Sequence, residues 1–140
     1  MIDAFDADVL IYAAVPGHPL GRRVAAVIGS APPRAQAGAG SVLLLPEVLG
    51  KPLRDGEAGE VRILASLLGR LDLRPVDLAT AELATSLSAR YKLKAADATH
   101  LATAIIVGAD RFITSNQRDF PQTITEIDIT YPAGLADPGA

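Results

Sequence analysis

The 140-residue chain contains no cysteine, only one methionine and only 4% aromatic residues. Without cysteine it has no disulfide framework, no zinc–thiolate site and no thiol nucleophile. No apolar run reaches the roughly 18 uninterrupted residues that a membrane-spanning helix needs. The N-terminus also lacks the basic stretch and the cleavage-site pattern of a signal peptide. We therefore expect a cytoplasmic protein with no membrane segment.

A strong excess of charge of either sign is also missing, because 13 basic and 16 acidic residues give a net charge of −3. This balance argues against binding nucleic acid through a broad basic surface, but it is compatible with an enzyme that grips a few phosphates locally. Hydrophobic residues make up 49% of the chain, enough for a sizeable core in one domain of ordinary size.

Short apolar segments alternate with stretches of helical periodicity along the chain. Strands or extended segments are predicted at residues 2–5, 41–45, 72–76, 111–114 and 124–129, with helices between them. This alternation predicts a three-layer α/β/α sandwich with a mostly parallel central sheet. We expect residues 1–130 to form a single domain, the Pro/Gly-rich segment 30–40 to be a mobile loop within it, and residues 131–140 to be a flexible C-terminal tail.

Acidic residues fall at the ends of the predicted strands. Asp6 and Asp8 follow the first strand, Glu47 follows the second, and Asp119 lies just past the strand 111–114. Asp97 lies in the first turn of a helix that should run antiparallel to the strand after it, so it belongs to the same edge. Sites in parallel sheets form outside the carboxyl ends of the strands. We therefore expect these acids to converge.

A cleft that holds four carboxylates must either take up protons or bind a cation. Two unit charges 4 Å apart repel by about 4 kcal/mol at an effective dielectric constant of 20. Ligands that are all oxygen, with no cysteine and no suitably spaced histidine, favour Mg²⁺ or Mn²⁺ over Zn²⁺. Such a site would activate a water molecule for attack on phosphorus, and a second ion would assist the leaving group.

Three stretches of the sequence, taken together, have the residue types and the order of one family. They are FDADVLIY at 5–12, LLPEVL at 44–49, and ADATHLATA at 96–104 followed by GADRFITSNQRDF at 108–120. In these stretches the chain resembles PIN domains, and specifically the VapC-type toxin ribonucleases of prokaryotic toxin–antitoxin pairs. The third stretch is the most specific of the three, and the resemblance covers nearly the whole chain.

The resemblance implies a Mg²⁺-dependent endoribonuclease acting on single-stranded or looped RNA, with Mn²⁺ able to substitute. It also implies a cognate antitoxin that occupies the cleft, and a homodimer. The catalytic residues and metal ligands that it implies are Asp6, Glu47, Asp97 and the more variable Asp119. The supporting residues, of which the last two would help to position the metal or its water, are Asp8, Thr114 and Asn116.

The chain departs from the family pattern at several points. Asp8 stands where the family often has Asn, and the segment 30–40 is longer than expected. Pro46 suits the first turn of a helix but can change where Glu47 points. His100 lies one helical turn after Asp97, where a structural role is favoured over that of a general base.

Alternatives remain open for several of these residues. Each acid, taken singly, has a structural interpretation as a turn or helix-cap residue. The basic residues before the last predicted helix form either a solvated helix end or a local rim that meets RNA phosphates; they are Arg90, Lys92 and Lys94.

Two other functions fit part of the sequence. In a haloacid-dehalogenase-like phosphatase Asp6 and Asp8 would be the nucleophile and the acid/base, but that fold requires a later lysine, and none follows Lys94. A PIN-like binding module without catalysis is the other alternative, against which the presence of all four acids argues.

Overall fold

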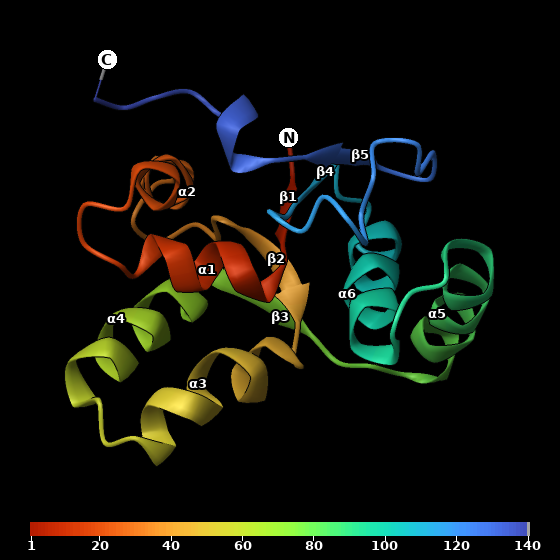
Figure 1. Ribbon diagram of the computed structural model, residues 1–140, viewed down its shortest axis with the longest axis horizontal. Helices are drawn as coiled ribbons and strands as arrows, with labels where there is room; N and C mark the ends of the chain where they lie inside the picture. Colours follow the sequence, from red (N-terminus) through yellow and green to blue (C-terminus); the bar gives the residue numbers. More distant parts are fainter. Residues whose placement is uncertain (140) are drawn as a thin grey trace.

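Five short parallel strands form one sheet in the computed structural model, which describes residues 1–139. The strands are β1 (Asp3–Phe5), β2 (Gly38–Ser41), β3 (Leu71–Arg74), β4 (Arg111–Ile113) and β5 (Asp128–Thr130). Their order is β3-β2-β1-β4-β5, and every neighbouring pair is parallel (Figure 1). The chain leaves β1 towards β2 on one side and later returns to β4 on the other. The carboxyl ends of β1 and β4 therefore flank the point where the strand order reverses, which is where sites form in such sheets.

Helices cover both faces of this sheet. They are α1 (Ala7–Ala13), α2 (Pro19–Gly29), α3 (Leu44–Arg54), α4 (Ala58–Leu68), α5 (Leu78–Tyr91) and α6 (Ala95–Ile106), and a 3₁₀ turn η1 (Pro132–Gly134) follows β5. Helices α1 to α4 lie on one side, whereas α6 packs on the other and α5 packs on α6 (Figure 1). This arrangement confirms the predicted three-layer α/β/α fold with a parallel sheet.

The alternation of side chains along the strands builds the two cores. Phe5 and Ile113 belong to the core shared with α1 to α4, while their neighbours Ala4 and Phe112 belong to the core under α5 and α6. Successive residues of a strand point to opposite faces, so a short strand with no polar face can bury both sides. The sheet is therefore fixed in position between two apolar layers.

The second strand lies earlier in the chain than predicted. The sequence predicts this strand at residues 41–45, but β2 is Gly38–Ser41, and Leu44 and Leu45 begin α3. At Gly38 an added Cβ would lie 2.4 Å from the carbonyl oxygen of Asp3, so this close pass of two strands requires glycine. The prediction of a mobile loop over 30–40 is accordingly wrong for its last three residues. The last strand, expected at 124–129, lies later in the chain, at Asp128–Thr130.

The segment after β5 packs against α2. Arg23 donates hydrogen bonds of 2.9 Å to the carbonyl oxygens of Ala133 and Leu135 and forms a 3.6 Å ion pair with Asp137. Leu135 is buried in the core on the α1–α4 side. The flexibility of residues 131–140 and the domain limits 1–130 stay predictions.

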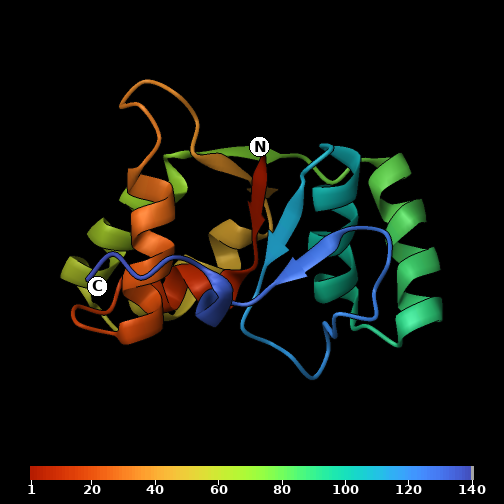
Figure 2. The same ribbon diagram turned by 90° about the horizontal axis from the view of Figure 1, so that it is seen from above.

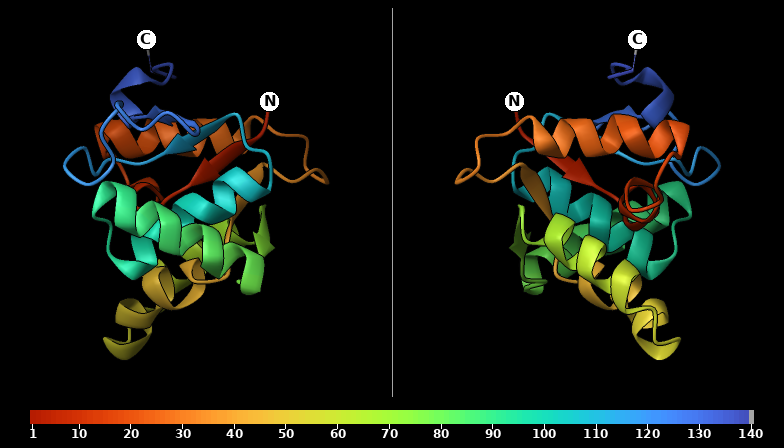
Figure 3. Two further views of the ribbon diagram at one scale, coloured as in Figure 1. Left: turned by 90° about the vertical axis from the view of Figure 1, so that its right-hand side faces the viewer. Right: turned by 90° about the vertical axis from the view of Figure 1, so that its left-hand side faces the viewer.

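The longest helix, α5, has 14 residues, and no helix described by the structure combines the length and hydrophobicity that a bilayer crossing requires. The turn between α3 and α4 projects from the body of the molecule, as both side views show (Figure 3).

Candidate active site

Asp6 stands where β1 passes into α1. Its backbone N–H donates to the carbonyl oxygen of Ile113, 3.0 Å away, which continues the pairing of β1 with β4. Its carboxylate caps α1 by accepting from the backbone N–H of Ala7 at 2.8 Å, and it accepts from the hydroxyl of Thr114 at 2.8 Å. Asp6 is only 5% exposed. Burial, and next the charge of Asp8, raise the pKa of this carboxyl from 3.8 to about 7.

Asp8 ties α1 to the loop that follows β4. Its carboxylate accepts from the backbone N–H of Ser115 at 3.2 Å and from the hydroxyl of the same residue at 2.7 Å. Sequence reasoning did not single out Ser115, whose signal was only its place next to Thr114. Both carboxylate oxygens of Asp6 and both of Asp8 therefore accept hydrogen bonds from the first residue of α1 or from the residues just after β4.

The loop after β4 also fixes Asp119. Thr114 is fully buried, and its hydroxyl oxygen accepts from the backbone N–H of Asn116 at 3.1 Å. The Asn116 side chain donates to the Asp119 carboxylate at 3.0 Å and accepts from the Asp119 backbone N–H at 3.1 Å. An Asx-type turn of this kind orders a loop through its own side chain. Thr114 and Asn116 thus place Asp119 relative to Asp6.

Asp97 connects the remaining acids electrostatically. Burial, followed by the charge of Asp119, raises its pKa, and the charge of Glu47 acts in the same direction. His100 and Lys94 act in the opposite direction, while Asp97 itself raises the pKa of Asp6. The start of α6 lies at the same edge as the ends of β1 and β4, as the view from above shows (Figure 2). Asp97 therefore lies within electrostatic reach of Asp6, Glu47 and Asp119, on the side of the sheet where the strand ends predicted these acids.

Glu47 reaches this edge from α3. Pro46 lies in the first turn of α3, as predicted, and Glu47 follows it. The Glu47 carboxylate lies 3.1 Å from Nε2 of His100, whose side chain is 1% exposed. His100 is thus a buried residue in contact with a candidate ligand, whereas the sequence indicated only a shared helix face with Asp97.

The acids have almost no positive charge to balance them. Within residues 1–139, one basic side chain lies within ion-pairing distance of any of these acids, and it is His100 beside Glu47. The acids compared are Asp6, Asp8, Glu47, Asp97 and Asp119. The three basic residues left open by the sequence have separate surroundings. Arg90 pairs with Glu126 at 2.9 Å, Lys92 takes the left-handed conformation that ends α5, and Lys94 precedes α6 and acts on Asp97.

The donor set suits a hard divalent cation, because it consists of carboxylate oxygens that repel one another in a partly buried setting. The geometry is more open than a closed ligand shell, since no group of three or more Asp, Glu or His side chains among residues 1–139 is close enough to hold a metal ion.

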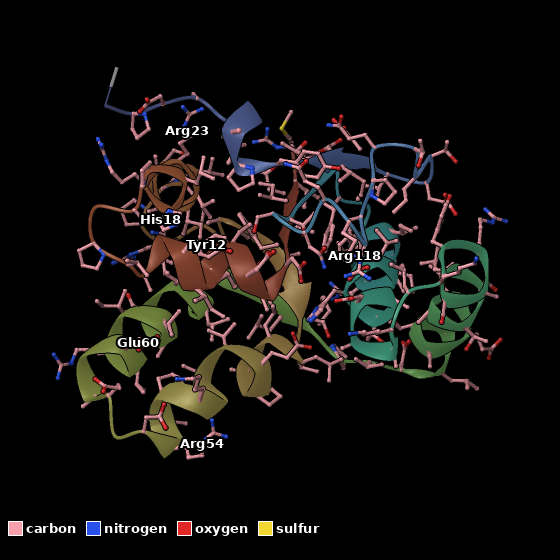
Figure 4. All side chains as sticks on the ribbon, viewed as in Figure 1. Tyr12, His18, Arg23, Arg54, Glu60 and Arg118 are labelled. Atoms are coloured by element: carbon pink, nitrogen blue, oxygen red, sulfur yellow. The ribbon has the colours of Figure 1, made fainter. Side chains whose placement is uncertain are left out.

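Arg118, which the sequence did not single out, is exposed in the loop after β4 and lies beside α6 in the view of Figure 4.

The sequence matches the profile of the PIN domain over residues 4–124, and the chain therefore belongs to the PIN domain family. Two solved structures share its fold. One is a chain of a toxin–antitoxin complex from Klebsiella pneumoniae, with a TM-score of 0.72, 24% identity, and coverage of 94% of this chain and 98% of that chain. The other belongs to VapBC2 from Rickettsia felis bound to a DNA fragment from their promoter, with a TM-score of 0.71, 16% identity and the same coverage. No curated protein matches the chain significantly.

These comparisons confirm the family resemblance and the fold class predicted from the three sequence stretches. Membership of the PIN domain family argues against the haloacid-dehalogenase-like phosphatase, and the lysine that this phosphatase requires is also missing after Lys94.

Proposed function

We propose that this PIN domain is a Mg²⁺-dependent endoribonuclease and the toxin of a toxin–antitoxin pair. One observation carries the proposal. Asp6 and Asp97 are partly or fully buried acids with raised pKa values, they act on one another, and no lysine or arginine of residues 1–139 pairs with either. Folding alone gives no reason to assemble unpaired acids, because burying a charge without a partner is unfavourable. A cation that enters from solution supplies that reason.

Asp6, Glu47, Asp97 and Asp119 would hold the Mg²⁺, and Mn²⁺ would take its place. When bound, the ion supplies Lewis-acid chemistry, since it lowers the pKa of water and stabilises charge on phosphate oxygens. The chain supplies the positioning. The hydroxyl of Thr114 holds Asp6, the amide of Asn116 holds Asp119, and Asp8 holds the loop between them through Ser115.

Lys94 is the basic residue that we propose for a backbone phosphate of RNA. It stands directly before α6, within electrostatic reach of Asp97, and no acid of residues 1–139 lies within ion-pairing distance of it. Arg90 is already engaged by Glu126. A single local contact of this kind agrees with a net charge of −3, which argues against a broad basic surface.

One of the two solved structures that share the fold is a toxin–antitoxin complex and the other is VapBC2 bound to promoter DNA, and this supports the proposal of an antitoxin partner for this chain. The proposal further includes a homodimer and a cytoplasmic location.

The test is RNA cleavage by the chain purified free of any partner. Structured RNA is supplied with Mg²⁺ or with EDTA, and the chain is compared with Asp97→Asn and with Asp128→Asn. Asp128 is a matched control because it is a carboxylate at the amino end of β5, away from the carboxyl ends of the strands. We expect cleavage in Mg²⁺ only, a loss of about 10³-fold in Asp97→Asn, and no change in Asp128→Asn.

Two results contradict the proposal in different ways. Cleavage that persists in EDTA or in Asp97→Asn comes from a contaminating nuclease. Binding of Mn²⁺ without cleavage of any RNA supports the alternative of a binding module that keeps the site and lacks the reaction.

A further inference from the structure

Glu47 is held differently from the other acids at the edge of the sheet. Asp6 and Asp8 accept hydrogen bonds from backbone N–H groups and hydroxyls of strand-end residues, and Asp119 accepts one from Asn116. The Glu47 side chain is 35% exposed and stands in the first turn of α3. Its hydrogen-bond partner among residues 1–139 is a single atom, Nε2 of His100.

His100 carries an unexplained cost. Its side chain is 1% exposed, and its second ring nitrogen, Nδ1, is buried with no hydrogen-bond partner in the described chain. Buried polar atoms in folded proteins almost always have a partner, and each exception calls for an explanation. A leucine would fill the same space in the core without this cost. This cost points to a role for the imidazole through Nε2, the ring nitrogen that has a partner.

We propose that His100 is a positioning residue, whose Nε2–H holds the Glu47 carboxylate towards Asp97. This inference rests on the proposed metal site and adds a residue that positions one of its ligands. Asp97 and His100 are one turn apart on α6, so one rigid, buried helix supplies a ligand and also aims the ligand carried by α3. Groups that orient a ligand matter nearly as much as the ligand itself, typically 10- to 100-fold in metal affinity.

The proposal also requires one particular tautomer of the neutral His100 ring. A neutral imidazole donates from one nitrogen and accepts at the other. Donation from Nε2 to the Glu47 carboxylate places the hydrogen on Nε2 and leaves Nδ1 as a bare acceptor, which is the nitrogen that lacks a partner. Nε2, and not Nδ1, is therefore the atom that the site requires.

The experiment measures Mn²⁺ affinity without RNA, by the electron paramagnetic resonance signal of free Mn²⁺ in a titration. The variants are His100→Leu, His100→Gln, His100→Asn, Glu47→Ala and the double variant that combines His100→Leu with Glu47→Ala. We expect His100→Leu to weaken Mn²⁺ binding by about 10- to 100-fold. Because His100 acts through Glu47, the same change in the Glu47→Ala background should have no further effect. His18→Gln is the matched control, since His18 caps α2 through Gly21 and should leave the affinity unchanged.

The pair His100→Gln and His100→Asn keeps the test decisive if His100→Leu does not fold. A glutamine amide reaches the place of Nε2, whereas an asparagine amide reaches only that of Nδ1, so Gln should restore Mn²⁺ binding and Asn should not. Unfolding in EDTA reports on the fold of each variant separately.

Any of three results overturns the inference. The first is equal Mn²⁺ affinity in His100→Leu and the unaltered chain, and the second is a full effect of His100→Leu in the Glu47→Ala background. The third is equal restoration of Mn²⁺ binding by His100→Gln and His100→Asn. In these cases the unaltered chain still binds Mn²⁺ and the proposed function stands. If the unaltered chain binds no Mn²⁺, the proposed function itself fails.

Discussion

Asp3 begins the three-residue strand β1 and Asp6 directly follows its last residue, and the surroundings of the two acids differ completely. Asp3 is 9% exposed and accepts from Nε and Nη2 of Arg111 at 2.7 and 3.2 Å. Asp6 is 5% exposed and faces further carboxylates in place of a cation. One end of the sheet neutralises its buried acid within the chain, while the other end gathers acids that the chain leaves unbalanced.

The difference separates an acid that serves folding from one that serves a ligand. Arg111 is the residue of β4 that pairs in register with Asp3 of β1, so the neutralising charge was available from the same strand pair. At the carboxyl end the neighbouring strand supplies Thr114, a neutral hydroxyl that leaves the charge of Asp6 in place. Removing the charge of Arg111 at one end should therefore lower the free energy of unfolding, whereas removing the charge of Asp6 at the other end should raise it.

The largest effect is expected at the neutralised end. Arg111→Met keeps the packing of the side-chain stem but leaves the Asp3 carboxylate unpaired, which should lower the free energy of unfolding by about 2–3 kcal/mol. Urea denaturation at pH 7 measures the change. Adding Asp3→Asn should recover part of the loss, because the uncompensated charge is then gone. A loss below about 0.5 kcal/mol would mean that the ion pair is no more than an exposed one.

An opposite and somewhat smaller effect is expected at the other end. Asp6→Asn removes a buried charge, keeps an oxygen for the N–H of Ala7 and turns an NH₂ towards the Thr114 hydroxyl, which can accept. In EDTA at pH 8 it should raise the free energy of unfolding by about 1–2 kcal/mol. Asp128→Asn, at the amino end of β5, should change little.

The same acid predicts a pH dependence. The pKa of Asp6 is about 7 in the folded chain and near 3.8 when unfolded. Since the folded state holds this proton more tightly, its contribution favours folding below pH 3.8 and is lost as the pH rises to about 7. Metal-free stability should therefore fall across this window, and the fall should be smaller in Asp6→Asn. A rise over the same range, in unfolding measured from pH 4 to 8, would contradict the assigned shift.

The smallest effect concerns Lys94, the cation near the unbalanced end. Lys94→Gln should raise the KM for RNA with little change in kcat, and should reduce the salt dependence of kcat/KM by about one phosphate contact, a slope of roughly 0.7 for single strands. Arg90→Gln is the control, because Arg90 is occupied by Glu126. Equal effects of the two substitutions would assign the phosphate contact to the general charge of this region.

The sequence predicted the acidic edge because parallel topology alone brings strand ends together. Asp6, Asp97 and Asp119 needed only the order of strands and helices to be right. It did not predict that Glu47 meets His100 or that Asp8 meets Ser115, because such contacts depend on the direction of each side chain. Periodicity also cannot distinguish a short buried strand from a helix start, and so the apolar run 41–45 predicts a strand where Gly38–Ser41 forms β2 and Leu44 begins α3.

The close pass of β2 against β1 has a consequence for sequence variation. An added Cβ at Gly38 would meet a carbonyl oxygen at 2.4 Å, and one at Gly21 would meet that of Tyr12 at 2.0 Å, whereas one at Gly50 or Gly59 would meet nothing within 4 Å. Backbone cannot yield as a flexible side chain can. In a saturation-mutagenesis library selected for folding, Gly38 and Gly21 should stay invariant while Gly50 and Gly59 accept alanine freely. The positions that do not tolerate substitution would thus identify where two backbone segments approach each other most closely.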